Sequence, residues 1–281
     1  MDQFPGVAVV TGAARGIGAA IVTGFAESGC HRIAITDILE TELGELRQSL
    51  LTRFNGNPND DPKSLTILAV PGDITSEPFI ESFFTTTKTK FSRIDYLVNV
   101  AGVGKPYRRS IEVDVQEFDF INNVNYRAAW LCSRAALKIM TVQEPLPSPS
   151  PSASTNESWT RPPQRGSIVN IASQLGVVSR PGASAYCASK AAVIGMTRAD
   201  AIDYSKDAIR VNAVCPGIVE TEMTTLDGVV REGLRESVNI APMGRMGNVR
   251  EIADCVLFLS SYRASFVQGH AMVVDGGYVI N

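Results

Sequence analysis

The stretch Val7-Ala-Val-Val-Thr-Gly-Ala-Ala-Arg-Gly-Ile-Gly18 decides the fold of this chain. Its four apolar residues Val7–Val10 predict a buried strand, and the glycines that follow allow a sharp turn into a helix starting near Gly16. A strand, a glycine-rich turn and a helix in this order are typical of a pyrophosphate-binding site, because a helix N-terminus attracts negative charge. The spacing is G-x-x-x-G-x-G, so the motif alone is also compatible with a plain turn.

Short β-branched runs alternate with longer helical patterns along the rest of the chain. Strands are predicted near Val7–Val10, Arg32–Thr36, Leu65–Val70, Ile94–Asn99, Ser167–Ile171, Ile209–Val214 and Met272–Val274. Helices are predicted near Gly16–Ser28, Leu39–Phe54, Glu77–Lys90, Val115–Met140, Ala185–Tyr204 and Val249–Ser260. Strands separated by helices of this length imply right-handed crossovers. We therefore predict one α/β domain over residues 1–281, a doubly wound Rossmann-type fold with about seven parallel strands and helices on both faces.

Composition excludes several classes of protein. The 281 residues are 44% hydrophobic and 20% charged with a net charge of −3, so there is no basic surplus for nucleic acid or an anionic membrane. No apolar run reaches the roughly 18 residues of a membrane span, and the N-terminus lacks the pattern of a signal peptide. Five scattered cysteines and two histidines predict reduced thiols and no metal site. These patterns predict a cytoplasmic protein whose partner is a small-molecule substrate.

Two segments interrupt the alternation of strands and helices. Glu144–Arg165 holds six prolines and five serines in 22 residues, which predicts a mobile surface insertion. It is either a docking segment for a proline-reading partner or an insertion without selected function. The second segment, Val219–Ile240, is interpreted as a flexible helical flap over the substrate.

Two residues give opposite indications about the cofactor. Asp37 ends the second predicted strand about 19 residues beyond Gly18, where a carboxylate can accept hydrogen bonds from the adenosine ribose of NAD and would repel the 2′-phosphate of NADP. Arg15, inside the turn, can pair with that phosphate. The position of Asp37 favours NAD, although the residue could also simply cap the next helix.

Tyr186 and Lys190 form the only pair in the chain in which a lysine follows a tyrosine by four residues. This spacing places both on one helical face, where the ammonium could lower the pKa of the phenol by about 1–3 units. Ser173 ends the strand thirteen residues before Tyr186, at the edge where parallel sheets place ligands. Taken singly, these residues also fit a surface pair and a turn serine.

The motifs together resemble those of the short-chain dehydrogenase/reductase family, over nearly the whole chain except Glu144–Arg165. The matching pieces are Thr11-Gly-x-x-x-Gly-Ile-Gly18, Asp73-Ile74, Asn99-Val-Ala-Gly102, Asn125, Ser173, Tyr186-x-x-x-Lys190 and Pro216-Gly-Ile-Val-Glu-Thr221. One departure is Val100, where the family often has a second asparagine; another is the proline-rich insertion.

The resemblance implies roles for these residues. Tyr186 would be the acid/base, Lys190 would lower its pKa and hold the nicotinamide ribose, Ser173 would bind the substrate oxygen, and Asn125 would support a proton relay. Asp73 would contact the adenine, and Val219 and Thr221 the carboxamide. The full set expected to bind the cofactor is Gly12, Arg15, Gly16, Ile17, Gly18, Asp37, Asp73, Ile74, Asn99, Ala101, Gly102, Tyr186, Lys190, Pro216, Val219 and Thr221.

The leading functional hypothesis is an oxidoreductase that transfers hydride between NAD and a secondary alcohol or ketone. One alternative is an NADPH-dependent ketoreductase of acyl, polyketide-like or other secondary-metabolite ketones, and another is a non-catalytic dinucleotide-binding scaffold. The substrate wall is expected from Val103–Ser110, Gln174–Gly182 and the flap. The resemblance also implies a homotetramer or homodimer built on the fourth and fifth helices and the last strand, and the apolar run Ala128-Ala-Trp-Leu131 offers positions for such a contact.

Overall fold

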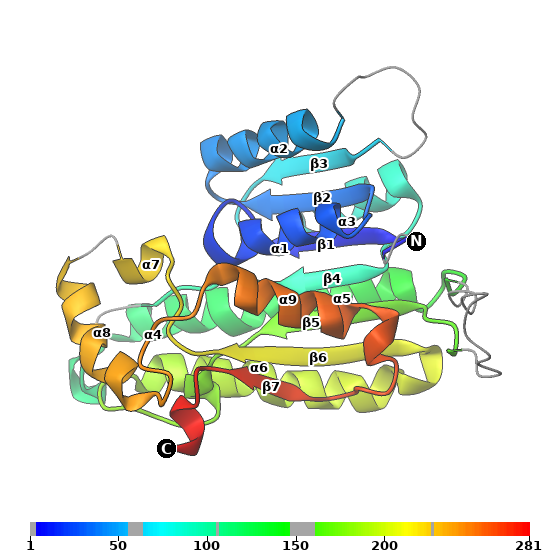
Figure 1. Cartoon of the computed structure of the whole chain (residues 1–281). Coiled ribbons are helices and arrows are strands. Elements are labelled where there is room, and N and C mark those ends of the chain that lie inside the picture. The colour runs from blue at the N-terminus through cyan, green and yellow to red at the C-terminus, as the bar shows by residue number, and fades with distance from the viewer. Residues whose placement is uncertain (1–3, 56–63, 105–106, 147–160, 226–227) are drawn as a thin grey trace.

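A seven-stranded parallel sheet forms the centre of the molecule (Figure 1). The computed structural model describes residues 4–55, 64–104, 107–146, 161–225 and 228–281. In chain order the strands are β1 (Val7–Thr11), β2 (Arg32–Asp37), β3 (Thr66–Pro71), β4 (Tyr96–Asn99), β5 (Gly166–Ile171), β6 (Ile209–Pro216) and β7 (Ala271–Val274). Their order across the sheet is β3-β2-β1-β4-β5-β6-β7, which confirms the predicted doubly wound Rossmann fold.

Helices cover both faces of this sheet. One layer holds α1 (Gly16–Glu27), α2 (Glu40–Phe54) and α9 (Val249–Ser260), and the other holds α3 (Glu77–Phe91), α5 (Ala128–Met140) and α6 (Ser184–Tyr204). The central strand β1 is completely buried, and its residues alternate between the two cores: Ala8 and Val10 join the first, Val7 and Val9 the second. This explains why the strand is apolar throughout.

The direction of winding changes between β1 and β4. The chain runs outward from β1 to β3, returns to the middle of the sheet, and then runs outward again from β4 to β7. The loops that leave β1 and β4 therefore diverge and leave a crevice at the carboxyl ends of the strands. In Figure 1 these ends point to the left, where α4 (Val115–Asn122), α7 (Glu222–Thr225) and α8 (Gly228–Ile240) lie.

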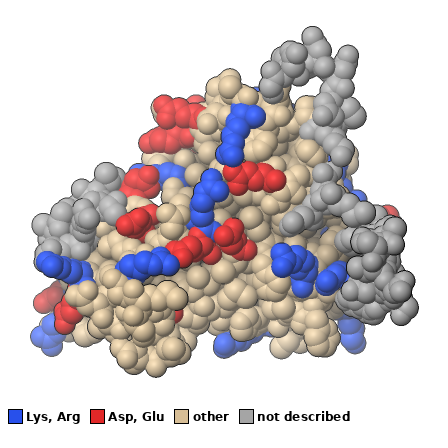
Figure 2. Space-filling model, viewed as in Figure 1, with Lys and Arg blue, Asp and Glu red and all other residues tan. Residues whose placement is uncertain are grey.

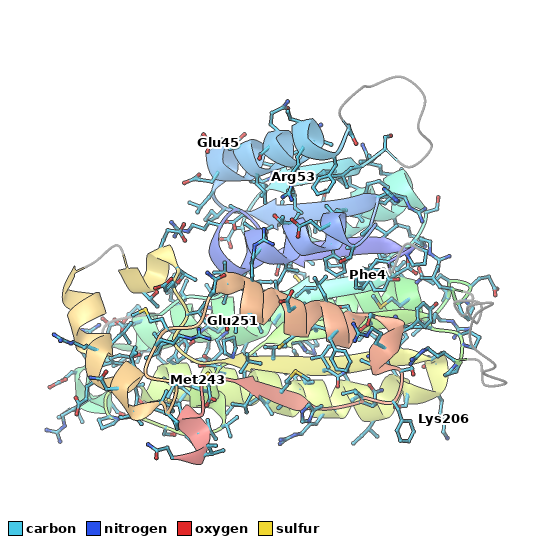
Figure 3. All side chains as sticks on the ribbon, viewed as in Figure 1. Phe4, Glu45, Arg53, Lys206, Met243 and Glu251 are labelled. Carbon is cyan, nitrogen blue, oxygen red and sulfur yellow. The ribbon has the colours of Figure 1, made fainter. Side chains whose placement is uncertain are left out.

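An aromatic cluster closes the opposite end of the first core. Phe4, which Figure 3 labels, stands edge-on to Phe25 and Tyr96 with ring centroids 4.9 and 5.2 Å away. Nearby, the buried carboxylate of Asp95 accepts from the backbone amide of Val7 at 2.8 Å and forms an ion pair with Arg93 at 2.7 Å. These contacts fix the start of β1, so the glycine turn at its other end is held in place.

Two expectations about the elements need correction, and a third stays a prediction. The helix predicted over Val115–Met140 is interrupted by a π-helical turn, η2 (Asn123–Arg127), between α4 and α5. The apolar run at the start of α5 is mostly used in the core, since Ala128, Ala129 and Leu131 are buried and only Trp130 is exposed. The flap region contains two helices, α7 and α8; its predicted flexibility stays a prediction.

The proline-rich insertion lies largely outside the described residues, which omit 147–160. Its two described ends meet in an antiparallel bridge between Leu146 and Gln164, just before β5 begins. Arg161 donates to the carbonyl of Tyr262 at 2.9 Å, and the Tyr262 hydroxyl donates to the carbonyl of Leu146 at 3.1 Å. The insertion therefore leaves the fold at the amino-terminal end of β5, away from the crevice.

Charge is evenly mixed on the face shown in Figure 2, where acidic and basic side chains are interspersed. Such a surface fits the net charge of −3 and presents no single-sign field to a polyanion. Among the described residues, no helix is both long enough and apolar enough to cross a membrane.

Candidate active site

Two glycines of the turn after β1, Gly12 and Gly18, leave no room for a side chain. Gly12 has a φ of +63°, and a Cβ there would lie 2.6 Å from the Cα of Ala101, which follows β4. A Cβ at Gly18 would lie 2.0 Å from the carbonyl oxygen of Gly12. The turn, the first residues of α1 and the loop after β4 thus pack backbone against backbone. Arg15, the N-cap residue of α1, is exposed and makes no capping hydrogen bond through its side chain.

Asp37 holds this turn from the neighbouring strand. One carboxylate oxygen accepts from the backbone amide of Ala14 at 3.0 Å, and the other accepts from that of Leu39 at 3.1 Å. Each carboxylate oxygen can accept more than one hydrogen bond, so the partly buried side chain keeps capacity for a ligand hydroxyl. The next residue, Ile38, is 71% exposed, and an apolar side chain so placed offers a surface on which a flat ring could pack.

The remaining adenosine-side residues lie at the ends of β3 and β4. Asp73 is exposed, and its Oδ1 accepts from the amide and the hydroxyl of Thr75, both at 2.8 Å. Asn99 is buried, and its amide group donates to Asn170 on β5 at 2.8 Å and to Ser133 at 3.0 Å. The Asn99 side chain therefore ties β4 to its neighbours, and we expect its cofactor contact to come from the main chain.

Asn125 lies in the π-helical turn and is 1% exposed. Its carboxamide forms a closed pair with the backbone of Val103: Oδ1 accepts from the amide at 2.7 Å, and Nδ2 donates to the carbonyl at 3.0 Å. Nδ2 also donates to Ser189 on α6 at 3.1 Å. A Cβ at Gly102 would lie 3.3 Å from both Asn125 Oδ1 and Lys190 Nζ, so the two side chains approach one another over this glycine.

Lys190 is a buried cation. Its ammonium donates to the carbonyl of Ile171, the last residue of β5, at 2.9 Å and lies 5.9 Å from the centre of the Tyr186 ring. Burial lowers the pKa of Lys190 to about 8, because the charged form loses water without gaining a carboxylate partner.

Tyr186 and Ser173 complete the group. Burial raises the pKa of the Tyr186 phenol to about 12, and a hydrogen bond with Ser173 opposes that rise. The lowering of this pKa by Lys190 stays a prediction, because desolvation of the phenolate dominates the pKa of Tyr186 in the cofactor-free protein. Ser173 is 8% exposed, and its Oγ accepts from the amide of Leu175 at 3.1 Å, which leaves the hydroxyl proton available to donate.

The segment after β6 borders the other side of the crevice. Pro216 ends β6, and Val219 is buried and bridges to Gly247 in a short parallel contact. Thr221 lies against the glycine turn, since a Cβ at Gly16 would be 3.4 Å from its methyl carbon. Of the two predicted carboxamide-binding residues, Thr221 therefore stands beside the start of α1.

Comparison with known proteins agrees with this architecture. Residues 6–146 match the family described as short chain dehydrogenase, and residues 150–279 match the one described as Enoyl-(Acyl carrier protein) reductase. A short-chain dehydrogenase of Penicillium roqueforti is 35% identical over 277 residues, which are 98% of this chain and 96% of that protein. The chain belongs to the short-chain dehydrogenase/reductase family. It is an NAD(P)-dependent oxidoreductase acting on alcohol or ketone groups.

Two further proteins that resemble this chain show the range of compounds named in the family. The 2-(R)-hydroxypropyl-CoM dehydrogenase of Xanthobacter autotrophicus is 35% identical, and the match spans 97% of this chain and 98% of that protein. The crystal structure of levodione reductase superposes with a TM-score of 0.82 at 28% identity, covering 98% of each chain.

The rim of the crevice includes residues of the segments Val103–Ser110 and Gln174–Gly182 that were expected to form the substrate wall, but the individual contacts between these segments were not predicted. Arg180 stacks on the ring of Tyr107 at 4.1 Å, and Arg108 forms an ion pair with Glu117 rather than facing the site as a free cation. The amide of Arg108 donates to the carbonyl of Gly182 at 2.9 Å, which joins the two segments expected to form the substrate wall. An arginine and a tyrosine 73 residues apart give no signal in the sequence. Lys105, also expected in this wall, lies outside the described residues.

Proposed function

We propose that this short-chain dehydrogenase interconverts a secondary alcohol and its ketone with NAD(H), and that Tyr186 transfers the proton. The observation that carries the proposal is the convergence of Ser173, Tyr186, Lys190 and Asn125 at the carboxyl ends of β4 and β5. The names of relatives, which include hydroxy-compound dehydrogenases and a 3-oxoacyl reductase, support a small-molecule alcohol or ketone as substrate.

The residues present fit a dinucleotide. Gly12 approaches Ala101 without an intervening side chain, and Arg15, the N-cap residue of α1, makes no capping hydrogen bond through its side chain. Together the turn and the start of α1 provide a cradle for a pyrophosphate, with Thr221 beside it. Asp37 would hold the adenosine ribose, Lys190 and Tyr186 the nicotinamide ribose, and Val219 and Thr221 the carboxamide. When bound, the cofactor supplies or accepts the hydride.

The protein side chains manage the proton and the developing charge. With a pKa of about 12, the Tyr186 phenol is protonated at neutral pH and can donate from Oη to a ketone oxygen. Ser173 Oγ donates to the same oxygen and stabilises the alkoxide that develops. The ammonium of Lys190, beside the ring, favours the phenolate that remains after donation. In alcohol oxidation the proton travels the opposite way, so we expect that rate to rise with pH.

NAD is favoured over NADP by the partly buried carboxylate of Asp37 at the end of β2. A negative charge there repels a ribose phosphate, and its anchoring by Ala14 and Leu39 keeps it in place. The exposed guanidinium of Arg15 supports the second candidate function, an NADPH-dependent ketoreductase.

The acid/base role predicts that Tyr186→Phe lowers kcat/KM by about 10²–10⁴-fold, because the transferable proton is lost. NADH affinity should fall by no more than about tenfold, because the variant loses one hydrogen bond to the nicotinamide ribose and keeps the other cofactor contacts. Steady-state rates on a panel of secondary alcohols and ketones measure kcat/KM, and a fluorescence titration measures NADH binding. Tyr204→Phe, on the same helix, is the matched control and keeps full turnover. Near-normal turnover by Tyr186→Phe contradicts the mechanism, and cofactor binding without turnover by the unmodified enzyme supports the scaffold alternative.

The cofactor preference predicts tighter binding of NADH than of NADPH in a paired fluorescence titration. Asp37→Asn is expected to reduce that preference by about tenfold or more, because a repulsive charge is removed while the side chain keeps its size. Arg15→Gln should weaken NADPH binding and leave NADH binding nearly unchanged. A wild-type enzyme that binds NADPH more tightly would instead support the ketoreductase.

We also propose that the enzyme is a homodimer or homotetramer assembled partly through α4, η2 and α5. Phe118, Tyr126 and Trp130 are exposed on these elements, at 46%, 36% and 43%. Three large exposed rings on consecutive elements favour contact with a second copy over contact with water.

A further inference from the structure

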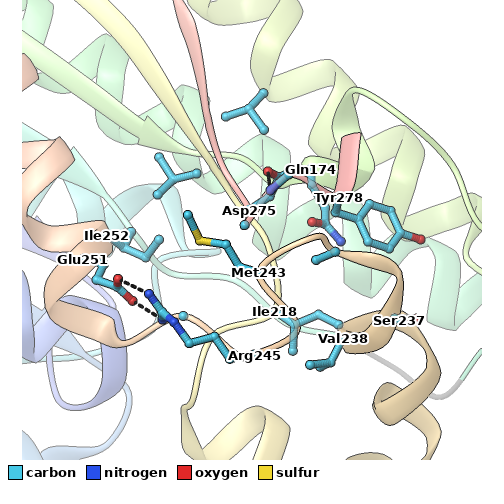
Figure 4. A pocket seen from close by; sticks show the side chains of 16 residues that line it. Gln174, Ile218, Ser237, Val238, Met243, Arg245, Glu251, Ile252, Asp275 and Tyr278 are labelled. Carbon is cyan, nitrogen blue, oxygen red and sulfur yellow. Dashed lines mark hydrogen bonds and ion pairs between the residues drawn. The ribbon is translucent and has the colours of Figure 1, made fainter. Parts of the chain in front are cut away.

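A cavity of about 300 Å³ lies beside the candidate active site, between the carboxyl ends of β6 and β7 and helices α8 and α9 (Figure 4). Much of its wall is apolar and includes Ile218, Val238, Met243 and Ile252. Gln174, which follows Ser173 directly, also lines it. The cavity is therefore lined by the direct chain neighbour of the residue expected to hold the reacting oxygen.

Gln174 has a buried side chain whose amide oxygen has no hydrogen-bond partner among the described residues. It is 5% exposed, and that amide oxygen is Oε1. Figure 4 shows its carboxamide pointing into the cavity. A Cβ at Gly217 would lie 2.9 Å from this Oε1 and 2.7 Å from the Cα of Asp275, so the glycine makes the room that the amide occupies. Leaving a buried carbonyl oxygen unpaired is unfavourable, so a ligand that brings a hydrogen-bond donor into the cavity gains a partner here.

The charged groups that line the cavity are already satisfied. Arg245 donates to both carboxylate oxygens of Glu251, at 2.9 and 2.7 Å. Asp275 accepts from the backbone amides of Gly277 and Val279, both at 2.8 Å. Binding a charged ligand group here would compete with these bonds, whereas a carboxamide can donate to and accept from a neutral hydroxyl or carbonyl.

We propose that Gln174 is a specificity-determining residue that binds a second oxygen of the substrate. The substrate class that fits is a neutral, mainly apolar alcohol or ketone that carries a hydroxyl or carbonyl group remote from the reacting carbon. This inference rests on the proposed function of the adjacent site, since Ser173 binds the reacting oxygen and the next residue binds the distant one.

Paired ketones that differ by one oxygen test this role. The pairs are 4-hydroxycyclohexanone with cyclohexanone, and 4-(4-hydroxyphenyl)-2-butanone with 4-phenyl-2-butanone. The second oxygen lies a short distance from the reacting carbon in the first pair and a long distance from it in the second. In at least one pair we expect the wild-type enzyme to prefer the hydroxylated member by about tenfold or more in kcat/KM. Gln174→Met keeps the length of the side chain but not its hydrogen bonds, so it should reduce that preference to within about twofold.

Gln48→Met, an exposed glutamine on α2, is the matched control and should keep the wild-type preference. The proposal is overturned if Gln174→Met lowers kcat/KM equally for both members of a pair, or if the wild-type enzyme turns over the ketones of both pairs without a preference. Thermal-shift binding of the same ketones to Tyr186→Phe, with and without Gln174→Met, separates the two failures. If Tyr186→Phe binds the hydroxylated ketone more tightly only when Gln174 is present, and the wild-type enzyme turns over no ketone, the proposed reaction fails and the specificity role stands. If the wild-type enzyme turns over both members of each pair equally well, only the specificity role fails.

Discussion

At Lys190 the proposed function has a cost in stability. Its ammonium is buried with a carbonyl partner and no carboxylate, and its pKa falls from 10.5 to about 8. A lowered pKa means that the folded state binds the proton less tightly than the unfolded state does. The penalty is therefore fully present below pH 8 and is relieved as the pH rises from about 8 to 10.5. We interpret it as the cost of keeping a cation beside the Tyr186 phenol.

Lys190→Met should abolish turnover and yet stabilise the cofactor-free enzyme at pH 7. The pKa shift corresponds to about 3 kcal/mol of destabilisation, which the substitution removes. Loss of the hydrogen bond to Ile171 destabilises the variant by about 1–2 kcal/mol, so its free energy of unfolding should rise by roughly 1–2 kcal/mol. Urea unfolding at pH 7 and pH 10 measures the difference, which should shrink at the higher pH. Lys206→Met removes an exposed lysine (Figure 3) and should change neither value. A Lys190→Met variant that is less stable at pH 7 contradicts this account of the burial cost.

At the scale of elements, the π-helical turn between α4 and α5 positions the site. A π-helical turn contains one extra residue but leaves the helical spacing of apolar residues intact on either side of it. The sequence pattern therefore predicts one continuous helix over Val115–Met140. The turn places Asn125 against the backbone of Val103, on the loop that follows β4. It thereby fixes the loop that carries Gly102, over which Asn125 and Lys190 approach each other.

Asn125→Ala should lower kcat by about tenfold or more and destabilise the fold by about 1–3 kcal/mol, because the amide and carbonyl of Val103 lose their partners. Stopped-flow or steady-state rates and denaturant unfolding measure the two effects. The matched control is Asn123→Ala, an exposed residue of the same π-helical turn, which should behave like wild type. Equal effects of the two substitutions would mean that the turn itself, rather than the Asn125 carboxamide, matters.

The sequence was sufficient for features that depend on local pattern and chain order. Strand apolarity and crossover length predicted the seven parallel strands, and the carboxyl ends of those strands gather Ser173, Tyr186 and Lys190 as expected. What it could not predict depends on burial and on contacts between distant segments. The raised pKa of Tyr186 is set by desolvation, and the amide oxygen of Gln174, which has no partner among the described residues, is visible only once the cavity around it has a shape.

For the whole molecule, the exposed rings of α4, η2 and α5 predict self-association. Trp130→Glu should halve the mass seen by light scattering, because a charge at a desolvated contact is costly, and it should leave NADH affinity within about twofold of wild type. Thr52→Glu, on exposed α2 of the other helical layer, is the control and should keep the assembly. A wild-type monomer at working concentration would show that these rings face solvent. The π-helical turn that carries Asn125 also carries Tyr126. A dimer that forms here would therefore pack directly against the turn that fixes the loop after β4, which carries Gly102. Loss of the dimer should lower kcat before it lowers cofactor binding.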